Sequence, residues 1–178
     1  MIFTPAQLPG VWVIELEKRE DERGFLARTY CEREFAAQGL NTRWPQCNLT
    51  LTRRRGGLRG LHYQAEPHPE IKLIRCAAGV IFDVLVDVRR GSPTYGRWAA
   101  FELSAASGRM LYVPGGVAHG FQCLTENCEV FYQMSEFYHP ELARGVRWDD
   151  PQLAIPWPIP EPSLSERDRQ WPYLSELP

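Results

Sequence analysis

The sequence has few lysines, little net charge and no long apolar run. Lys18 and Lys72 are the only lysines among 20 basic residues, and 22 acidic residues bring the net charge to −2. A protein that binds nucleic acid needs an excess of positive charge to displace counterions from phosphates, so we expect no nucleic-acid partner. No apolar run reaches the roughly 20 residues of a membrane-spanning helix. The opening MIFTPAQLPG lacks the basic and apolar regions of a signal peptide, so we expect no membrane partner.

Cysteine is too sparse for a disulfide scaffold. The five cysteines are odd in number and contain no CxxC pair. Disulfides persist in oxidising compartments, whereas free thiols are usual in the cytoplasm. We therefore expect a reduced, cytoplasmic protein with buried thiols.

Short strand patterns separated by turn signals make up most of the chain. In residues 80–88, apolar residues alternate with Asp83, Leu85 and Asp87. Further strands are expected over residues 71–76, 97–103, 109–113, 120–124 and 128–137. Regular spacing of this kind is typical of an antiparallel sandwich or barrel. Because no repeat or low-complexity tract interrupts the chain, we expect one all-β domain over residues 1–178.

Two short helices and an ordered coil are expected beside the strands. One helix is predicted near residues 32–38, and a second over 165–170 with Ser163 or Ser165 as its cap. The proline-rich segment 151–162 also carries large apolar residues. We therefore expect this segment to wrap around the barrel in an ordered conformation.

Two motifs resemble the paired motifs of the cupin barrel. PGGVAH, which ends at His119, matches the second motif. The first motif, HxH followed by a Glu, is matched by His62 alone, because Gln64 replaces the second His and Lys72 replaces the Glu. A protonated ammonium cannot ligate a metal, and an amide is a poor ligand for transition metals. The expected fold is a cupin-type antiparallel β-barrel (jelly roll) with no metal at this position.

His62 is the candidate general base. The cupin register directs it into the barrel mouth, and a histidine base needs a carboxylate to fix its tautomer. Asp83, Asp87 and Asp168 each qualify by composition, and spacing selects none of them. Arg59 lies three residues before His62, and strand residues three apart face opposite sides unless a bend intervenes.

Further candidates follow from residue type and position. Lys72 lies within an apolar strand, where an inward-facing ammonium is costly unless it has a purpose. Tyr132 is either an ordinary core tyrosine or a site residue, and Tyr138 follows the same strand at the expected rim. Arg23 and Arg59 are candidate phosphate ligands, because a guanidinium binds phosphate in a bidentate manner.

The sequence resembles the dTDP-4-dehydrorhamnose 3,5-epimerase family of nucleotide-sugar epimerases, over nearly its whole length. The most specific matches are LRGLHYQ (58–64) and LYVPGGVAHGFQ (111–122). The other matching segments are DERGF (21–25), QCN (46–48), GSPTYG (91–96), EVFYQMSEFY (129–138), RGVRWDDP (144–151) and SERDRQWP (165–172).

The resemblance implies four catalytic roles. His62 is similar to the base that removes the proton next to a ketone, and Asp168 to its partner carboxylate. Lys72 resembles the residue that stabilises the enolate oxygen. Tyr132 resembles the acid that returns a proton on the opposite face. A fixed cation at a developing oxyanion is typically a large electrostatic contribution to catalysis.

The resemblance also implies substrate contacts and a homodimer. Arg59 matches a pyrophosphate contact, Gln46 and Asn48 match positions near the nucleotide, and His119 either contacts the ligand or supports the barrel mouth. Arg23 resembles a residue that reaches into the partner subunit's site. A homodimer is expected for that reason, and because the N-terminal strand of each chain would cover the other's sheet edge.

The expected function is epimerisation at C3, C5 or both of a nucleotide-linked 4-keto-6-deoxyhexose. The 4-keto group acidifies both C–H bonds, so no cofactor is required. Leu26 and Arg28 replace a Phe and a Glu that are common in the family, which leaves the nucleotide base open. The alternatives are a mono-epimerase acting on a CDP- or GDP-linked sugar, a metal-dependent cupin oxygenase, and a non-catalytic sugar-nucleotide binding module.

Overall fold

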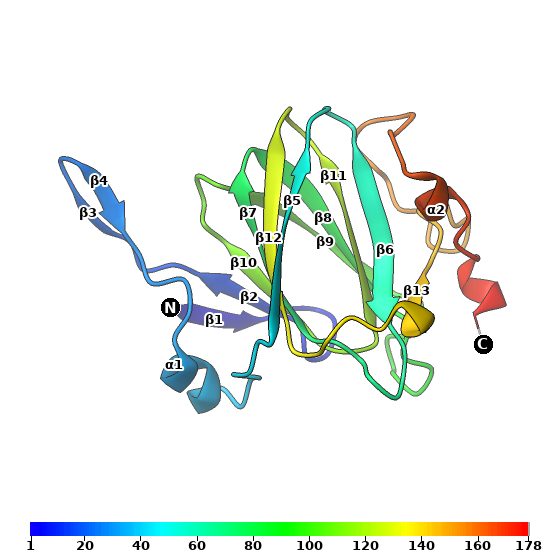
Figure 1. Cartoon of the computed structure of the whole chain (residues 1–178), viewed down its shortest axis with the longest axis horizontal. Coiled ribbons are helices and arrows are strands. Elements are labelled where there is room, and N and C mark those ends of the chain that lie inside the picture. The colour runs from blue at the N-terminus through cyan, green and yellow to red at the C-terminus, as the bar shows by residue number, and fades with distance from the viewer. Residues whose placement is uncertain (178) are drawn as a thin grey trace.

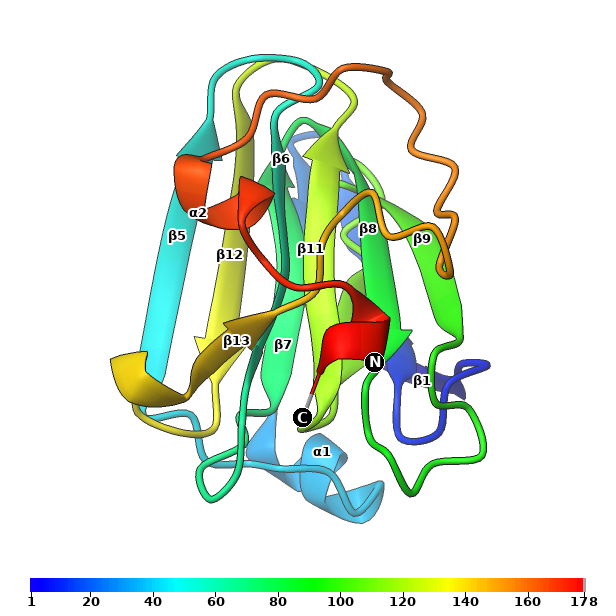
Figure 2. The ribbon, with the colours of Figure 1, turned by 90° about the vertical axis from the view of Figure 1, so that its right-hand side faces the viewer.

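Two antiparallel β-sheets lie face to face in the computed structural model, which describes residues 1–177 (Figures 1 and 2). The six-stranded sheet has the order β1 (Ile2–Pro5), β2 (Trp12–Glu15), β10 (Met110–Val113), β7 (Lys72–Ala78), β12 (Cys128–Met134) and β5 (Gln46–Thr52). The five-stranded sheet has the order β13 (Ala143–Gly145), β6 (Leu58–Gln64), β11 (Val117–Cys123), β8 (Val80–Asp87) and β9 (Trp98–Ser104).

The remaining elements lie outside this sandwich. A hairpin of β3 (Arg19–Asp21) and β4 (Gly24–Leu26) projects away from the body of the molecule (Figure 1). The helices are α1 (Glu32–Ala37), α2 (Glu166–Arg169) and the 3-10 turns η1 (Pro140–Leu142) and η2 (Leu174–Glu176). Within residues 1–177 no helix is long and apolar enough to cross a membrane.

Strand β8 is buried on both faces, so its alternating sequence does not separate a buried face from an exposed one. Ile81 and Leu85 belong to the core between the two sheets. Val84 and Val86 face the other way and pack against the segment that follows residue 150, including Trp157. Figure 2 shows this C-terminal segment crossing the outer face of the five-stranded sheet. The predicted wrapping coil is therefore present, and it covers the second apolar row of β8.

The outer face of the six-stranded sheet is partly covered by α1. Phe35, the buried residue of this helix, packs on Ile14, Leu73 and Met110. Its ring also meets Tyr112 at a centroid distance of 6.5 Å. Burial of large aromatic rings contributes strongly to core stability, so this cluster fixes the N-terminal segment onto the sheet.

The predicted elements agree with the structure to within a few residues. The expected helices become α1 and α2, and Ser165 rather than Ser163 caps α2, because its Oγ accepts a hydrogen bond from the Asp168 backbone N at 3.1 Å. Strand β11 begins at Val117, three residues earlier than predicted. Strand β5 and the β3–β4 hairpin were not predicted. The β3–β4 hairpin is exposed throughout and has no apolar row. Strand β5 has such a row, but its Leu49 and Leu51 are exposed rather than part of the core.

Candidate functional site

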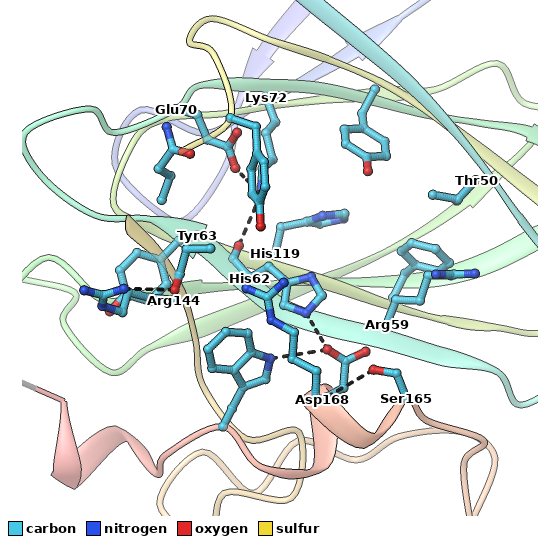
Figure 3. A pocket seen from close by; sticks show the side chains of 17 residues that line it. Thr50, Arg59, His62, Tyr63, Glu70, Lys72, His119, Arg144, Ser165 and Asp168 are labelled. Atoms are coloured by element: carbon cyan, nitrogen blue, oxygen red, sulfur yellow. Dashed lines mark hydrogen bonds and ion pairs between the residues drawn. The ribbon is translucent and has the colours of Figure 1, made fainter. Parts of the chain in front are cut away.

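A pocket of about 260 Å³ opens between the two sheets and is closed on one side by α2 (Figure 3). Seven of the ten residues predicted for the site line it: Arg59, His62, Lys72, His119, Tyr132, Tyr138 and Asp168. The side chains come from β6, β7, β11, β12 and α2, so segments far apart in the sequence build one site.

A bulge in β6 places Arg59 and His62 on the same side of the strand. Arg59 pairs with Phe121 and His62 with His119, so two residues of β6 lie opposite the single Gly120 of β11. Such a bulge reverses the side-chain alternation that follows it. Gly60 adopts a φ of +133°, and a Cβ there would lie 2.4 Å from the Gly120 Cα. Glycine at position 60 is therefore a requirement of the site.

The side chains of His62 and Asp168 form a hydrogen-bonded pair. His62 Nε2 lies 2.5 Å from Asp168 Oδ1. The same carboxylate oxygen accepts a hydrogen bond from Trp171 Nε1 at 3.3 Å, and Ser165 caps the helix turn that carries Asp168. The structure thus brings together the base and the carboxylate that the resemblance implied, although 106 residues separate them.

The other two candidate carboxylates have other partners. Asp83 is fully buried and contacts His119 Nε2 through Oδ2 at 2.8 Å. Burial raises the pKa of Asp83, and the nearby imidazole of His119 opposes this shift. Burial would also raise the pKa of Asp87, but hydrogen bonds from Arg89 and the hydroxyls that follow it lower this pKa to about 2. Asp87 therefore stabilises a turn, and only Asp168 serves His62.

The two members of the His62–Asp168 pair titrate in favourable directions. Burial by the pocket walls lowers the pKa of His62, although 41% of its side chain faces the pocket. Asp168 opposes this shift, and the charge of Lys72 adds to it. Burial would raise the pKa of Asp168, but the interaction with His62 and the hydrogen bonds from Ser165 and Trp171 together outweigh it, so this pKa is lowered. At neutral pH the pair is a neutral imidazole beside an ionised carboxylate, as a general base requires.

Lys72 is buried beside His62, as predicted. Its Nζ lies 3.0 Å from Glu70 Oε1 and donates a hydrogen bond to the backbone O of His62 at 3.2 Å (Figure 3). Glu70 was not predicted. Its position was a signal, because residues two apart on an extended chain point to the same side, as Glu70 and Lys72 do. A buried ammonium needs a compensating negative charge, and the carboxylate of Glu70 supplies it.

Gln64, at the second cupin His position, is committed to backbone hydrogen bonds. Its Nε2 donates to the carbonyls of His68 and Phe137, at 2.6 and 3.1 Å, and its Oε1 accepts from the backbone N of His139 at 2.9 Å. The side chain therefore fastens two loops to the barrel rim, and its amide is occupied in doing so.

The remaining pocket candidates lie on several elements. Arg59 donates from Nε to Thr52 Oγ1 at 2.9 Å, which holds the guanidinium at the pocket edge. Tyr132 projects from β12, in the sheet opposite His62. Tyr138 lies at the rim and is largely exposed, as expected.

Three predicted contacts lie outside the pocket of their own chain. Gln46 accepts a hydrogen bond from the backbone N of Tyr138, so it supports the rim. Asn48 is exposed on β5, paired in register with Tyr132. Arg23 is 84% exposed on the projecting hairpin, where it pairs with Asp21. Sequence reasoning missed Arg144 and Arg167, two further cations of the pocket wall.

The fold and the pocket define a β-barrel enzyme of acid–base chemistry. A hydrogen-bonded His–Asp pair has the geometry of a general base, a buried ammonium lies beside it, and a phenol lies in the opposite sheet. This arrangement suits proton transfer at a carbon next to a carbonyl group.

Known proteins agree with this class and give the family. The family model for dTDP-4-dehydrorhamnose 3,5-epimerase matches residues 5–176. The enzyme of that name from Methanothermobacter thermautotrophicus is 44% identical, over 99% of this chain and 96% of its own. The dTDP-4-dehydrorhamnose 3-epimerase of Streptomyces niveus is 40% identical, over 99% of this chain and 85% of its own. The Bacillus anthracis 3,5-epimerase, solved with TDP and PPi bound, has a TM-score of 0.94 and 37% identity, and the match covers 97% of this chain and 98% of that one.

The chain belongs to the dTDP-4-dehydrorhamnose 3,5-epimerase family. The predicted cupin-type fold is confirmed, and so is the enzyme class, an isomerase. The predicted reaction, epimerisation of a nucleotide-linked 4-keto-6-deoxy sugar, is confirmed by membership of this family, and the sugar carrier is dTDP. Family membership sets aside the metal-dependent oxygenase and the non-catalytic binding module.

Proposed function

We propose that His62, Asp168, Lys72 and Tyr132 carry out this epimerisation at both C3 and C5, converting dTDP-4-dehydro-6-deoxyglucose to dTDP-4-dehydrorhamnose. The observation that carries the proposal is the 2.5 Å contact between His62 and the carboxylate of Asp168 inside the pocket. An imidazole oriented in this way is the arrangement expected of a general base.

The first step removes a proton next to the ketone. With its proton on Nε2 and donated to Asp168, His62 carries a free lone pair on Nδ1. This nitrogen accepts the proton of C3 or C5 while the C–H electron pair moves into the ring to form an enolate. The negative charge gathers on the C4 oxygen, where the ammonium of Lys72 stabilises it. Glu70 holds that ammonium in place from the side.

The second step returns a proton from the opposite direction. His62 belongs to the five-stranded sheet, whereas Tyr132 and Lys72 belong to the six-stranded sheet. A sugar between the sheets would therefore meet the base on one face and the phenol on the other. Tyr132 donates its hydroxyl proton to carbon and regains one from solvent, and His62 releases its proton to solvent. Inversion of the carbon is the net result.

The nucleotide part of the substrate requires positive charge at the pocket edge. Arg59, Arg144 and Arg167 supply it, and guanidinium groups bind phosphate oxygens with two parallel hydrogen bonds. The TDP and PPi bound to the Bacillus anthracis relative support a thymidine nucleotide as the carrier. Gln46 and Asn48 remain proposed contacts near the nucleotide, and His119 a proposed substrate contact supported by Asp83.

Exchange of solvent deuterium tests the reaction and its positions. We expect the protein in deuterated water to exchange both C3–H and C5–H of a dTDP-linked 4-keto-6-deoxyglucose, observed by NMR. The matching CDP- and GDP-linked sugars should exchange far more slowly. Exchange at C3 alone would make the protein a mono-epimerase, as the Streptomyces niveus relative is named. Faster exchange with a CDP or GDP sugar would contradict the proposed carrier.

We also place the protein in the cytoplasm as one domain over residues 1–178. The two sheets share a single apolar core, which supports one folding unit. All five cysteines are free, and Cys76, Cys123 and Cys128 are buried. Free thiols of this kind are usual in a reducing compartment.

A homodimer is the proposed assembly. The β3–β4 hairpin projects from the body and exposes Phe25 and Leu26 beside Arg23 (Figure 1). Leu49 and Leu51 are exposed on β5, at the edge of the six-stranded sheet. Exposed apolar residues on an unpaired sheet edge favour association. β1 forms the other edge of its own sheet, paired with β2, so a partner could extend either edge.

Mixing two inactive variants tests whether Arg23 serves the partner's site. We expect light scattering to give twice the 20.5 kDa mass of one chain, and R23A and H62A each to be inactive alone. Refolded together in equal amounts, they should regain about one quarter of the wild-type activity, because half of the dimers are mixed and each mixed dimer has one intact site. No recovery from dimeric variants would mean that Arg23 acts within its own chain, and an R23A variant that is active alone would mean that Arg23 has no role in the reaction.

A further inference from the structure

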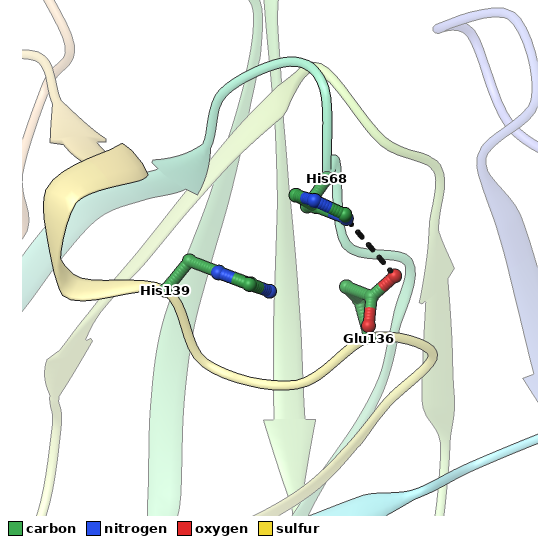
Figure 4. A group of neighbouring side chains, drawn as sticks. All are labelled: His68, Glu136 and His139. Carbon is green, nitrogen blue, oxygen red and sulfur yellow. Dashed lines mark ion pairs between the residues drawn. The ribbon is translucent and has the colours of Figure 1, made fainter.

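A group of metal-ligating side chains lies outside the catalytic pocket. His68 belongs to the loop between β6 and β7, and Glu136 and His139 belong to the loop after β12 (Figure 4). One ligand atom of each residue lies within 4.8 Å of the other two. Two imidazoles and one carboxylate, gathered from two loops, are the ligand types that zinc prefers.

We propose that His68, Glu136 and His139 bind one divalent transition-metal ion of the zinc class per chain. Water would complete a tetrahedral site. The ion would join the two loops at the rim of the pocket, and no step of the epimerisation passes through it. The site is thus separate from the position where a metal-binding cupin holds its ion, which His62, Gln64 and Lys72 make unsuitable here.

A second carboxylate supports this assignment by orienting one ligand. His139 Nδ1 lies 3.2 Å from Glu141 Oε1. Histidine ligands of metals usually donate their other ring N–H to a carboxylate, which fixes the tautomer. With Glu141 accepting from Nδ1, Nε2 of His139 carries the lone pair that a metal needs. His68 Nδ1 faces Glu136 Oε2 at 3.6 Å, so this pair is already close together (Figure 4).

The side chain of Gln64 ties the backbones of the two loops together. The buried amide of Gln64 bonds the carbonyls of His68 and Phe137 and the backbone N of His139. Binding therefore does not have to bring two mobile loops together. A site that is partly preorganised loses less entropy when the ion binds.

The two rings must tilt before they can share an ion. They are stacked at a centroid distance of 4.3 Å with an interplanar angle of 7°. Imidazole lone pairs lie in the ring plane, so parallel rings do not point at one ion. The side chains of His68, His139 and Glu136 are 45%, 30% and 33% exposed. Rotation of these partly exposed side chains is enough, and it leaves the backbone and Gln64 in place.

Calorimetric titration with ZnCl₂ tests the proposal on tag-free protein stripped with a chelator. We expect one Zn²⁺ per chain, and loss of this binding in H68A and in H139A. E141Q should bind on the order of 10- to 100-fold more weakly, the usual effect of losing a carboxylate that orients a ligand. H62A should bind as well as the wild type, because its substitution lies in the pocket. CoCl₂ should give the intense visible bands of tetrahedral Co²⁺ with the wild type and with H62A, but not with H68A or H139A.

Two results would overturn the proposal. One is wild-type binding no stronger than that of H68A and H139A. The other is binding that H62A abolishes and H68A does not, which would place the ion in the pocket. Thermal unfolding in chelator controls for folding, because H68A, H139A and E141Q should then melt like the wild type. Zinc should raise Tm only where the site is intact, since a ligand stabilises the state that binds it.

Discussion

Replacing His62 with alanine is expected to lower deuterium exchange at both C3 and C5 by about 10⁴-fold, the upper end of what one acid–base group contributes. Asp168 cannot replace the base, because its hydrogen bonds and α2 hold it behind His62. Exchange measured by NMR in deuterated water gives the rate at each carbon separately. If His62 is the base for both carbons, the exchange rates at C3 and C5 must fall together.

The controls for this variant are its fold and its affinity for dTDP. The arginines proposed to bind phosphate also line the pocket and are unchanged in this variant. We therefore expect the dissociation constant of dTDP to change little, and Tm to fall because the buried Asp168 loses its partner. Full exchange by a folded H62A variant would remove His62 as the base. Loss at one carbon only would show that a second base serves the other.

Replacing Lys72 with methionine is expected to lower kcat by about 100- to 1000-fold, the usual effect of losing one donor to a developing oxyanion. It should also move the acidic limb of the kcat/KM profile to higher pH. The Lys72 charge disfavours protonation of His62 and so lowers its pKa. Without that charge the pKa of His62 rises, and the base is lost to protonation at a higher pH. A pH profile of wild type and variant measures both effects.

Two further variants separate this electrostatic role from damage to the fold. Lys72→Met leaves Glu70 with an unpaired charge, which is itself destabilising, so the double variant K72M/E70Q removes both charges. It should regain stability but not kcat. Lys18→Met, at the only other lysine, should leave kcat unchanged, because Lys18 lies over Phe25 outside the pocket. A K72M/E70Q variant with wild-type kcat would disprove the oxyanion role.

Local sequence pattern predicted the barrel because short strand patterns recur between turn signals. Strand β8 was recognisable in this way, and the helix at Glu32 was recognisable from the glycine that follows it. Hairpin β3–β4 was not predicted, because it is short and exposed throughout. Strand β5 was not predicted either, although Leu49 and Leu51 alternate there with polar residues. Lys72 was also recognisable, since a charge inside an apolar strand is costly and so indicates a purpose.

The geometry of the site depends on features that local pattern does not contain. The sequence spacing could not show which of the three candidate aspartates pairs with His62, because α2 brings Asp168 to His62 only by folding back onto β6. Strand periodicity placed Arg59 and His62 on opposite faces of β6, because a regular strand lacks the extra residue that the bulge inserts between them. Glycine at position 60 was the available signal, since a glycine within a strand often marks a bulge.

The order of the site residues along the chain has a consequence for folding. The last strand of the pocket wall, β13, ends at Gly145, whereas the carboxylate that orients His62 belongs to α2. A chain that stops before Ser165 would therefore contain every strand of the barrel and still lack the partner of His62. We expect closure of the barrel and formation of the His62–Asp168 pair to be separable events in folding.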